Sequence, residues 1–357
     1  MKRKIYISLI ACLCLLSCQK ENASEMLSDG HCIYLAASVE GTKESRTPYT
    51  WSAPSKEHAL GVDVWASTTS EVFLNSGKNG TGQYNNEVAL HTTAKFTNAS
   101  EQLLNDAVYP NSEDTKVYFV GMYPQGWTNE ANNGKSASYV FNGSQDVMFA
   151  PQISGSYGEN DGSDDKPWPV FQFKHLLTWL RLEIKAETEE VMKAWGKLKS
   201  IQVKSKNQVT IDLTKSAYTA GNVFDESIVT FQSTEADDEK QVLDVYATNT
   251  DQVLSNVSIP YNKYTDAGYV LCAPVTAKAE DAETHERLGE YTLIIKTEKR
   301  SLEVEVDLKT EVNSYFEGST RRCQFNINLL FKMGNTISVS ARAEEWKNGG
   351  IIINDVN

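Results

Sequence analysis

The chain has 357 residues, 40% of them hydrophobic, and a formal net charge of −13 at pH 7. This length allows about two domains, and the apolar content is enough for real cores without disulfide staples. The negative charge disfavours binding to nucleic acid or to an anionic lipid surface, since both repel an acidic protein. We therefore expect no nucleic-acid partner and interpret the charge as a source of solubility.

The first residues form a secretory signal that ends in a lipoprotein cleavage site. Cations at positions 2–4 precede an apolar run at 5–16, and Ser17-Cys18 follows it. The run is too short for a membrane-spanning helix, which takes about 20 apolar residues, so we expect residues 1–17 to be removed. The thiol of Cys18 is then the attachment point for lipid, which anchors the mature chain on a membrane. An ordinary signal peptide with a chance cysteine is the alternative.

Beyond Cys18 three cysteines remain, at Cys32, Cys272 and Cys323. An odd number does not describe a disulfide framework. Cys323 falls in phase with Phe325 in an alternating run, which predicts a small buried hydrophobic residue. A bridge between Cys272 and Cys323 is left open as an alternative.

Alternation of apolar and polar residues with period two recurs along the whole chain and predicts an all-β fold. The expected strands are, in chain order, 31–39, 60–65, 117–123, 201–203, 209–213, 291–295, 301–308 and 336–341. The pair 201–203 and 209–213 is predicted to form a hairpin. Two short helices are expected near 100–107 and 189–198, and neither is long enough to set the fold class. Many short strands with Gly, Asn, Asp and Ser turns favour β-sandwiches.

A polar, glycine-rich tract at 154–169, closed by two prolines, predicts a loop that links two domains. After it, Phe171 and Phe173 share one strand face, whereas Leu180 and Leu182 take the opposite phase. A bulge, or passage of the chain from one core to another, would explain this change. We set the boundary between residues 165 and 166, with alternatives as far as the turn at 205.

The sequence offers no catalytic or metal-binding pattern. Histidines are scattered at 31, 58, 91, 175 and 285, without the spacing of a zinc site, and neither a nucleophile elbow nor a phosphate loop occurs. We therefore expect no cofactor, no metal and no enzymatic activity. His175, between Phe173 and Leu177, is predicted to be a hydrogen-bonded core residue. The acidic loop 159–165 could bind calcium, but without EF-hand spacing a solvated loop is the preferred interpretation.

Aromatic content suggests an alternative function. The chain has 7 Trp and 16 Tyr, and aromatic faces stack on sugar rings, so a surface lipoprotein that binds glycans is a second hypothesis. Most of these residues fall in strand phase and are expected to fill cores. Trp127, in the loop 124–129, is the aromatic residue expected to be exposed.

Five features follow one another in a recognisable order. They are Cys18 with the strand 31–39 and the arginine-containing stretch 41–47; Trp51 with the strand 60–65; Tyr109-Pro110 with 117–124; the run from Phe171 to Leu177; and 337–341 with Trp346 to Gly350. In this order they resemble the fimbrillin family, the pilins and pilin-like lipoproteins of Bacteroidetes-type fimbriae. The resemblance covers nearly the whole chain, although the tail after Trp346 is shorter than in major pilins.

The resemblance implies two transthyretin-like β-sandwich domains in tandem and a structural role as stalk, anchor or tip pilin. It implies export as a lipoprotein to the outer-membrane surface and assembly with other fimbrial subunits by strand exchange, after an arginine-directed protease has removed the first strand. We place this cut after Arg46, in a polar, turn-like stretch. The implied organisation is a signal peptide at 1–17, a propeptide with the removable strand at 18–46, and sandwich domains at 47–165 and 166–357.

Overall fold

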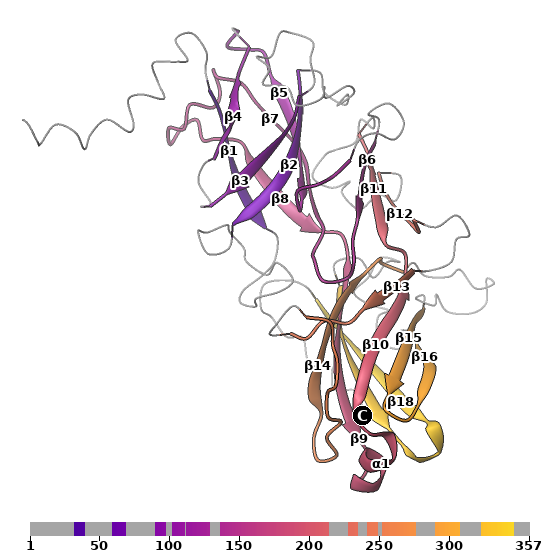
Figure 1. Cartoon of the computed structure of the whole chain (residues 1–357). Coiled ribbons are helices and arrows are strands. Elements are labelled where there is room, and N and C mark those ends of the chain that lie inside the picture. The colour runs from indigo at the N-terminus through magenta and orange to yellow at the C-terminus, as the bar shows by residue number, and fades with distance from the viewer. Residues whose placement is uncertain are drawn as a thin grey trace, which may run out of the picture.

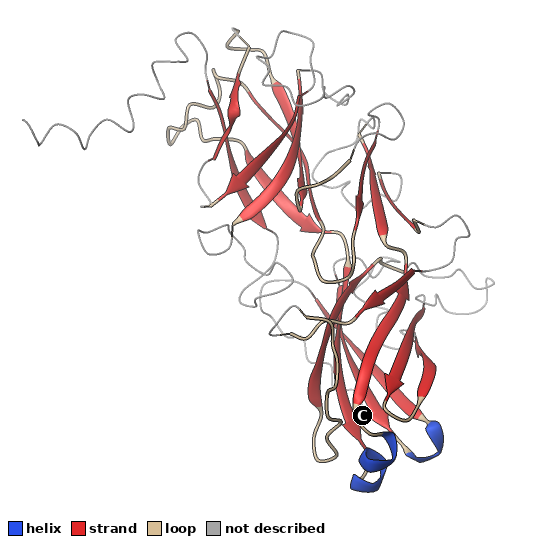
Figure 2. Ribbon diagram, viewed as in Figure 1, coloured by secondary structure: helices blue, strands red, loops and turns tan. Residues whose placement is uncertain are grey.

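The computed structural model describes residues 32–39, 59–68, 90–97, 102–110, 112–128, 136–213, 228–234, 241–248, 252–275, 290–307 and 323–345. Strands dominate these ranges (Figure 2), which confirms the expected all-β class. The N-terminal strands are β1 (Cys32–Val39), β2 (Leu60–Ser67), β3 (Leu90–Phe96), β4 (Gln102–Val108), β5 (Val117–Tyr123), β6 (Ser136–Val140), β7 (Met148–Gly155) and β8 (Val170–His175).

The later elements are β9 (Thr178–Ala186), the helix α1 (Glu189–Trp195), β10 (Leu198–Ser205), β11 (Gln208–Asp212), β12 (Val229–Gln232), β13 (Gln241–Asp244), β14 (Thr265–Cys272), β15 (Glu290–Thr297), β16 (Ser301–Asp307), β17 (Cys323–Phe331), a 3-10 turn (Met333–Asn335) and β18 (Ile337–Glu345). Helix α1 begins where the Thr188 hydroxyl accepts a hydrogen bond from the Val191 amide (3.3 Å) and ends at Gly196. The helix expected near 189–198 is therefore confirmed. No helix within the described ranges is long and apolar enough to cross a membrane.

Seven strands form the first sheet, in the order β3-β2-β5-β7-β8-β1-β4. Its neighbouring strands run antiparallel except β1 and β8, which run parallel. The two end strands, β3 and β4, approach each other, so the sheet rolls around a core of apolar side chains from β1, β2, β5, β7 and β8. Figure 1 shows these strands grouped apart from the C-terminal strands.

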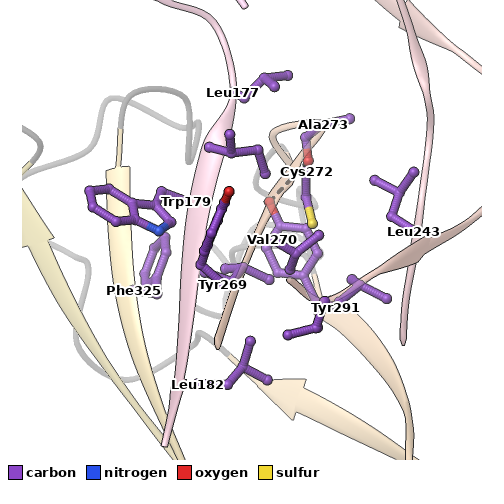
Figure 3. Packing of buried hydrophobic residues seen from close by; sticks show 14 of the residues in the cluster. Leu177, Trp179, Leu182, Leu243, Tyr269, Val270, Cys272, Ala273, Tyr291 and Phe325 are labelled. Atoms are coloured by element: carbon purple, nitrogen blue, oxygen red, sulfur yellow. Dashed lines mark hydrogen bonds between the residues drawn. The ribbon is translucent and has the colours of Figure 1, made fainter. Parts of the chain in front are cut away.

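Two four-stranded sheets, β13-β10-β15-β16 and β14-β9-β17-β18, enclose the second core. Alternate side chains of β9 and β17 point into it, as the period-two pattern of these segments predicts. Figure 3 shows Tyr269 and Tyr291 among its aliphatic side chains, where the Tyr291 hydroxyl donates to the Ala273 carbonyl (3.0 Å). Cys272 and Cys323 are both buried and are not joined by a disulfide, and the burial of Cys323 confirms its prediction.

A third sheet, β12-β11-β6, joins strands from both halves of the chain. Its buried apolar residues belong to the second core, and so do Trp65 and Met122, which lie on the outer face of the first sheet. The two halves are therefore connected by continuous apolar packing.

The chain passes from the first sheet to the second core just after β8. Phe171 and Phe173 are buried in the first core, whereas Leu176 and Leu177 belong to the second. This confirms a passage between cores as the cause of the phase change. The tract 154–169 connects β7 to β8, two strands of the first sheet, so the chain leaves that sheet beyond the predicted boundary at 165/166.

Two predictions of local structure are wrong. Residues 201–213 do contain two strands, but β10 pairs with β13 and β15, whereas β11 pairs with β6 and β12. They form no hairpin, because the turn carries the chain from one sheet to another, and the Asn207 backbone bonds Phe141 and Gln232 instead. The segment near 100–107 is the strand β4, not a helix, because pairing with β1 overrides its local helical preference.

Candidate functional site

The strand β1 occupies the gap between β8 and β4 in the first sheet (Figure 1). It lies within the stretch 18–46, which the family resemblance predicts to be a removable propeptide. Leu35 lies opposite Gln102 of the antiparallel β4, and Ala37 lies opposite Phe171 of the parallel β8. The Ala36 amide also donates to the Pro169 carbonyl (2.9 Å). One end of β1 therefore completes the pairing of β4, and the other end completes the pairing of β8.

The side chains of β1 alternate between the core and the opposite face. Ile33, Leu35 and Ala37 are 0%, 0% and 1% exposed, and Val39 is 4% exposed. The first three therefore share one apolar face, as expected for alternate residues of the predicted strand 31–39. Full burial stabilises an aliphatic side chain of this size by about 1.5–3 kcal/mol, so β1 contributes a substantial part of the first core.

The loop before β8 covers the other face of β1. The rings of Tyr34 and Trp168 lie 4.9 Å apart, and Trp168 in turn packs on Gly162. Gly162 has a φ of +82°, and a Cβ atom there would lie 2.3 Å from the Trp168 ring. Glycine at this position therefore allows Trp168 to pack against β1.

The turn after β5, which follows Tyr123-Pro124, is fixed to β2 by a carboxylate that the sequence did not reveal. Asp63 is 3% exposed, and its Oδ2 accepts hydrogen bonds from the amides of Gly126 (2.7 Å) and Trp127 (2.8 Å). Its Oδ1 lies 3.3 Å from Nε2 of His91, whose ring stacks on Trp65. The prediction that Trp127 is exposed is wrong, because this anchor holds the residue in the core at 3% exposure.

His175 is 1% exposed, and its Nδ1 lies 2.6 Å from Oδ2 of Asp146. This confirms the prediction of a hydrogen-bonded core histidine, but sequence reasoning missed its partner. Asp146 also accepts from the Val147 amide (2.8 Å). Burial raises the pKa of Asp146, although His175 and the Val147 amide act in the opposite direction. The pair lies where the chain passes between the two cores.

Cys18 and Arg46, the predicted lipidation and processing residues, lie outside the described residues. The described chain holds no cluster of three or more His, Cys, Asp or Glu side chains that could bind a metal. Within the acidic loop, the Asp161 carboxylate accepts a hydrogen bond from the Ser163 amide (2.9 Å). This bond stabilises the turn in which Asp161 lies.

No protein-family model and no curated protein matches the chain. Among solved structures it is similar to a proposed cell adhesion protein from Bacteroides uniformis, with 12% identity, a TM-score of 0.48 and coverage of 88% of this chain and 98% of that one. A proposed cell adhesion protein from Bacteroides ovatus has 13% identity, a TM-score of 0.49 and coverage of 91% and 99%.

A further similar structure is that of a proposed polysaccharide-binding protein from Bacteroides thetaiotaomicron. It has 9% identity, a TM-score of 0.41 and coverage of 88% of this chain and 96% of that one. At these identities and TM-scores the likeness assigns no function to this chain.

Proposed function

We propose that this chain is a structural subunit of a cell-surface fimbria, exported as a lipoprotein and assembled by strand exchange. The observation that carries the proposal is the position of β1, which comes from the predicted propeptide and fills the gap between β4 and β8. A strand from a neighbouring subunit takes its place once it has been removed.

Loss of β1 exposes two kinds of surface at once. The apolar pockets that hold Ile33, Leu35 and Val39 open to water, which removes about 1.5–3 kcal/mol of stabilisation for each side chain. The backbone groups of β4 and β8 that pair with β1 also lose their partners. An unpaired edge of this kind is a template for another strand.

A strand from a second subunit restores both the apolar packing and the backbone pairing. Its backbone pairs with the two edges, and its alternate side chains refill the pockets, which is β-augmentation used as a bond between subunits. The precursor is protected from premature assembly because its own first strand occupies the gap. Processing therefore controls when polymerisation begins.

The cut belongs after Arg46, since this position lies between the last residue of β1, Val39, and the first residue of β2, Leu60. Cleavage there separates β1 from the remaining chain without dividing either strand. The surrounding residues are polar and turn-like, as suits a protease site.

The proposal is tested by treating purified precursor with an arginine-specific protease and measuring its mass by light scattering. We expect oligomers that resist heat, because each bond buries a whole strand. An Arg46→Lys variant is the matched control, since it keeps the charge but removes the cut. A cleaved chain that stays monomeric at high concentration and keeps its fragment bound contradicts strand exchange for this protein.

The lipid attachment has its own test. We expect a Cys18→Ala variant to remain in the soluble periplasmic fraction, because acyl chains on Cys18 are the proposed membrane attachment. The measurement is fractionation followed by a high-salt wash, with Cys32→Ala as the control that keeps the lipidation site. A variant without Cys18 that still sediments with membranes after the wash contradicts the lipoprotein assignment.

A further inference from the structure

A groove with a volume of about 320 Å³ lies between β6 and β13. Its lining comes from β6 and the segment after it, within residues 139–145, and from β13 and the segment after it, within residues 241–246, with Asn207 also in the lining. This volume is near the lower end of the range for sites that bind small molecules. The groove lies in neither the β1 gap nor the first core.

The groove offers apolar surface to a ligand. Val140 and Val242 are 54% and 45% exposed, and both line it. Single exposed valines are ordinary on a protein surface, but these two share one groove with Tyr139 and Tyr246. The tyrosine rings add flat apolar faces, and the Tyr139 ring packs against Trp127 with a distance of 5.6 Å between ring centroids.

Hydrogen-bond donors stand beside this apolar surface. Gln145 accepts the Tyr139 hydroxyl proton with its Oε1 (3.0 Å), and Asn142 accepts from the Ser144 amide with its Oδ1 (3.0 Å). In each case the carbonyl oxygen of the side chain is engaged, so the NH₂ group is the part left to donate. Partial burial raises the pKa of Tyr139 and Tyr246, so both phenols keep their protons at neutral pH.

Asp244 supplies the acceptor. Its Oδ1 accepts from Nε2 of Gln202 (2.8 Å), which fixes the carboxylate, while its Oδ2 accepts no hydrogen bond from the described residues. It is the charged side chain among the residues that line the groove. A second negative charge in a ligand would therefore be repelled.

Hydrogen bonds hold the lining residue Asn207 in place. Asn207 bonds Thr234 twice through its side chain, as acceptor from the amide (3.1 Å) and as donor to the hydroxyl (3.2 Å). Its carbonyl accepts from the Phe141 amide (2.8 Å), and Phe141 is 3% exposed. A groove fixed in this way loses little conformational entropy when a ligand binds.

We infer that this groove binds a neutral saccharide through one or two of its sugar rings. A sugar ring has an apolar C–H face and adjacent hydroxyls that each donate and accept. Tyr139, Tyr246 and the two valines would pack against the C–H face. The side-chain amides and Asp244 would form hydrogen bonds with the hydroxyls. The inference adds a recognition site to the subunit and does not depend on strand exchange.

The test uses the uncleaved chain, so that polymerisation plays no part. Methyl glycosides of glucose, galactose, mannose and N-acetylglucosamine, with lactose, maltose and cellobiose, are titrated and followed by ligand-observed NMR. We expect at least one to bind with a Kd on the order of mM, as suits so small a contact. Asp244→Asn and Tyr246→Ala are each expected to weaken it at least tenfold.

Two control variants make the same kinds of substitution outside the groove. Asp164→Asn changes an exposed carboxylate, and Tyr261→Ala removes a tyrosine that is 45% exposed, both outside the groove. Neither is expected to alter binding. Val242→Trp provides a second blocking variant, because it fills the groove from an exposed position and so preserves folding.

Two results overturn the inference. The first is that none of the seven saccharides binds. The second is binding that the groove variants leave unchanged while their melting temperatures match that of the parent chain, because the saccharide then binds elsewhere.

Discussion

Single buried carboxylates do much to fix this fold at the residue scale. Asp63 joins β2 to the turn after β5 through two backbone amides, and Asp146 joins the segment before β7 to the end of β8 through His175. Neither was predicted, because an aspartate in the strand β2 or in the segment before β7 has the same sequence signature whether it faces water or has buried hydrogen-bond partners. Its role depends on Gly126 and His175, which lie far away in the sequence.

We predict that Asp63→Ala lowers the free energy of unfolding by about 2–4 kcal/mol, since it leaves the buried amides of Gly126 and Trp127 without an acceptor. Asp63→Asn should cost less, because an amide oxygen can still accept. Urea denaturation of both variants, with the exposed Asp164→Asn as control, measures the difference. Equal stability of Asp63→Ala and the parent would show that the anchor is not needed.

The Asp146–His175 pair predicts a dependence of stability on pH. Burial holds the pKa of folded Asp146 above its ordinary value, so between the unfolded and folded pKa values the folded state binds more protons. The stability that Asp146 contributes is therefore present at low pH and is lost as the pH rises through the folded pKa.

Asp146→Asn removes this titration and keeps an acceptor for His175. We expect the parent to lose stability relative to the variant as the pH rises above the ordinary pKa of an aspartate, as measured by denaturation at constant ionic strength. A difference of the opposite sign would mean that the carboxylate is favoured in its ionised form.

At the scale of elements, alternation predicted the strands but not their partners. β1, β2, β5 and β18 lie where the period-two pattern placed them, because a half-buried strand imposes that pattern on its own residues. β4 was mistaken for a helix, since its strand conformation depends on β1, more than sixty residues earlier in the chain. The predicted hairpin of β10 and β11 failed for the same reason, because each strand pairs with a distant segment.

We predict that Leu35→Ala destabilises the precursor by about 2–5 kcal/mol, because the side chain is fully buried and its loss leaves a cavity under β1. Ser38→Ala, on the opposite face of the strand, is the control and should cost less than about 1 kcal/mol, since it removes one long hydrogen bond to Phe171 (3.3 Å). Chemical denaturation of both variants checks the ranking. Equal effects would mean that β1 contributes little to the core.

For the whole molecule, the sequence predicted the all-β class and gave passage between cores as one of two explanations for the phase change, but it did not predict the shared packing of the two halves. The third sheet takes β6 from the N-terminal half and β11 and β12 from the C-terminal half. The groove between β6 and β13 was missed for the same reason, because its lining comes from three separate segments. The apolar face of β1 could be predicted, since Ile33, Leu35 and Ala37 alternate within one strand.

The central claim is that the gap left by β1 is the site where a neighbouring subunit inserts its strand. The most direct measurement adds a synthetic peptide of residues 32–39 in excess to the cleaved, fragment-free chain and follows its mass by light scattering. The peptide should occupy the gap between β4 and β8 and hold the chain as a monomer, whereas a scrambled peptide should leave polymerisation unchanged. Polymers that form equally fast with either peptide would contradict the account.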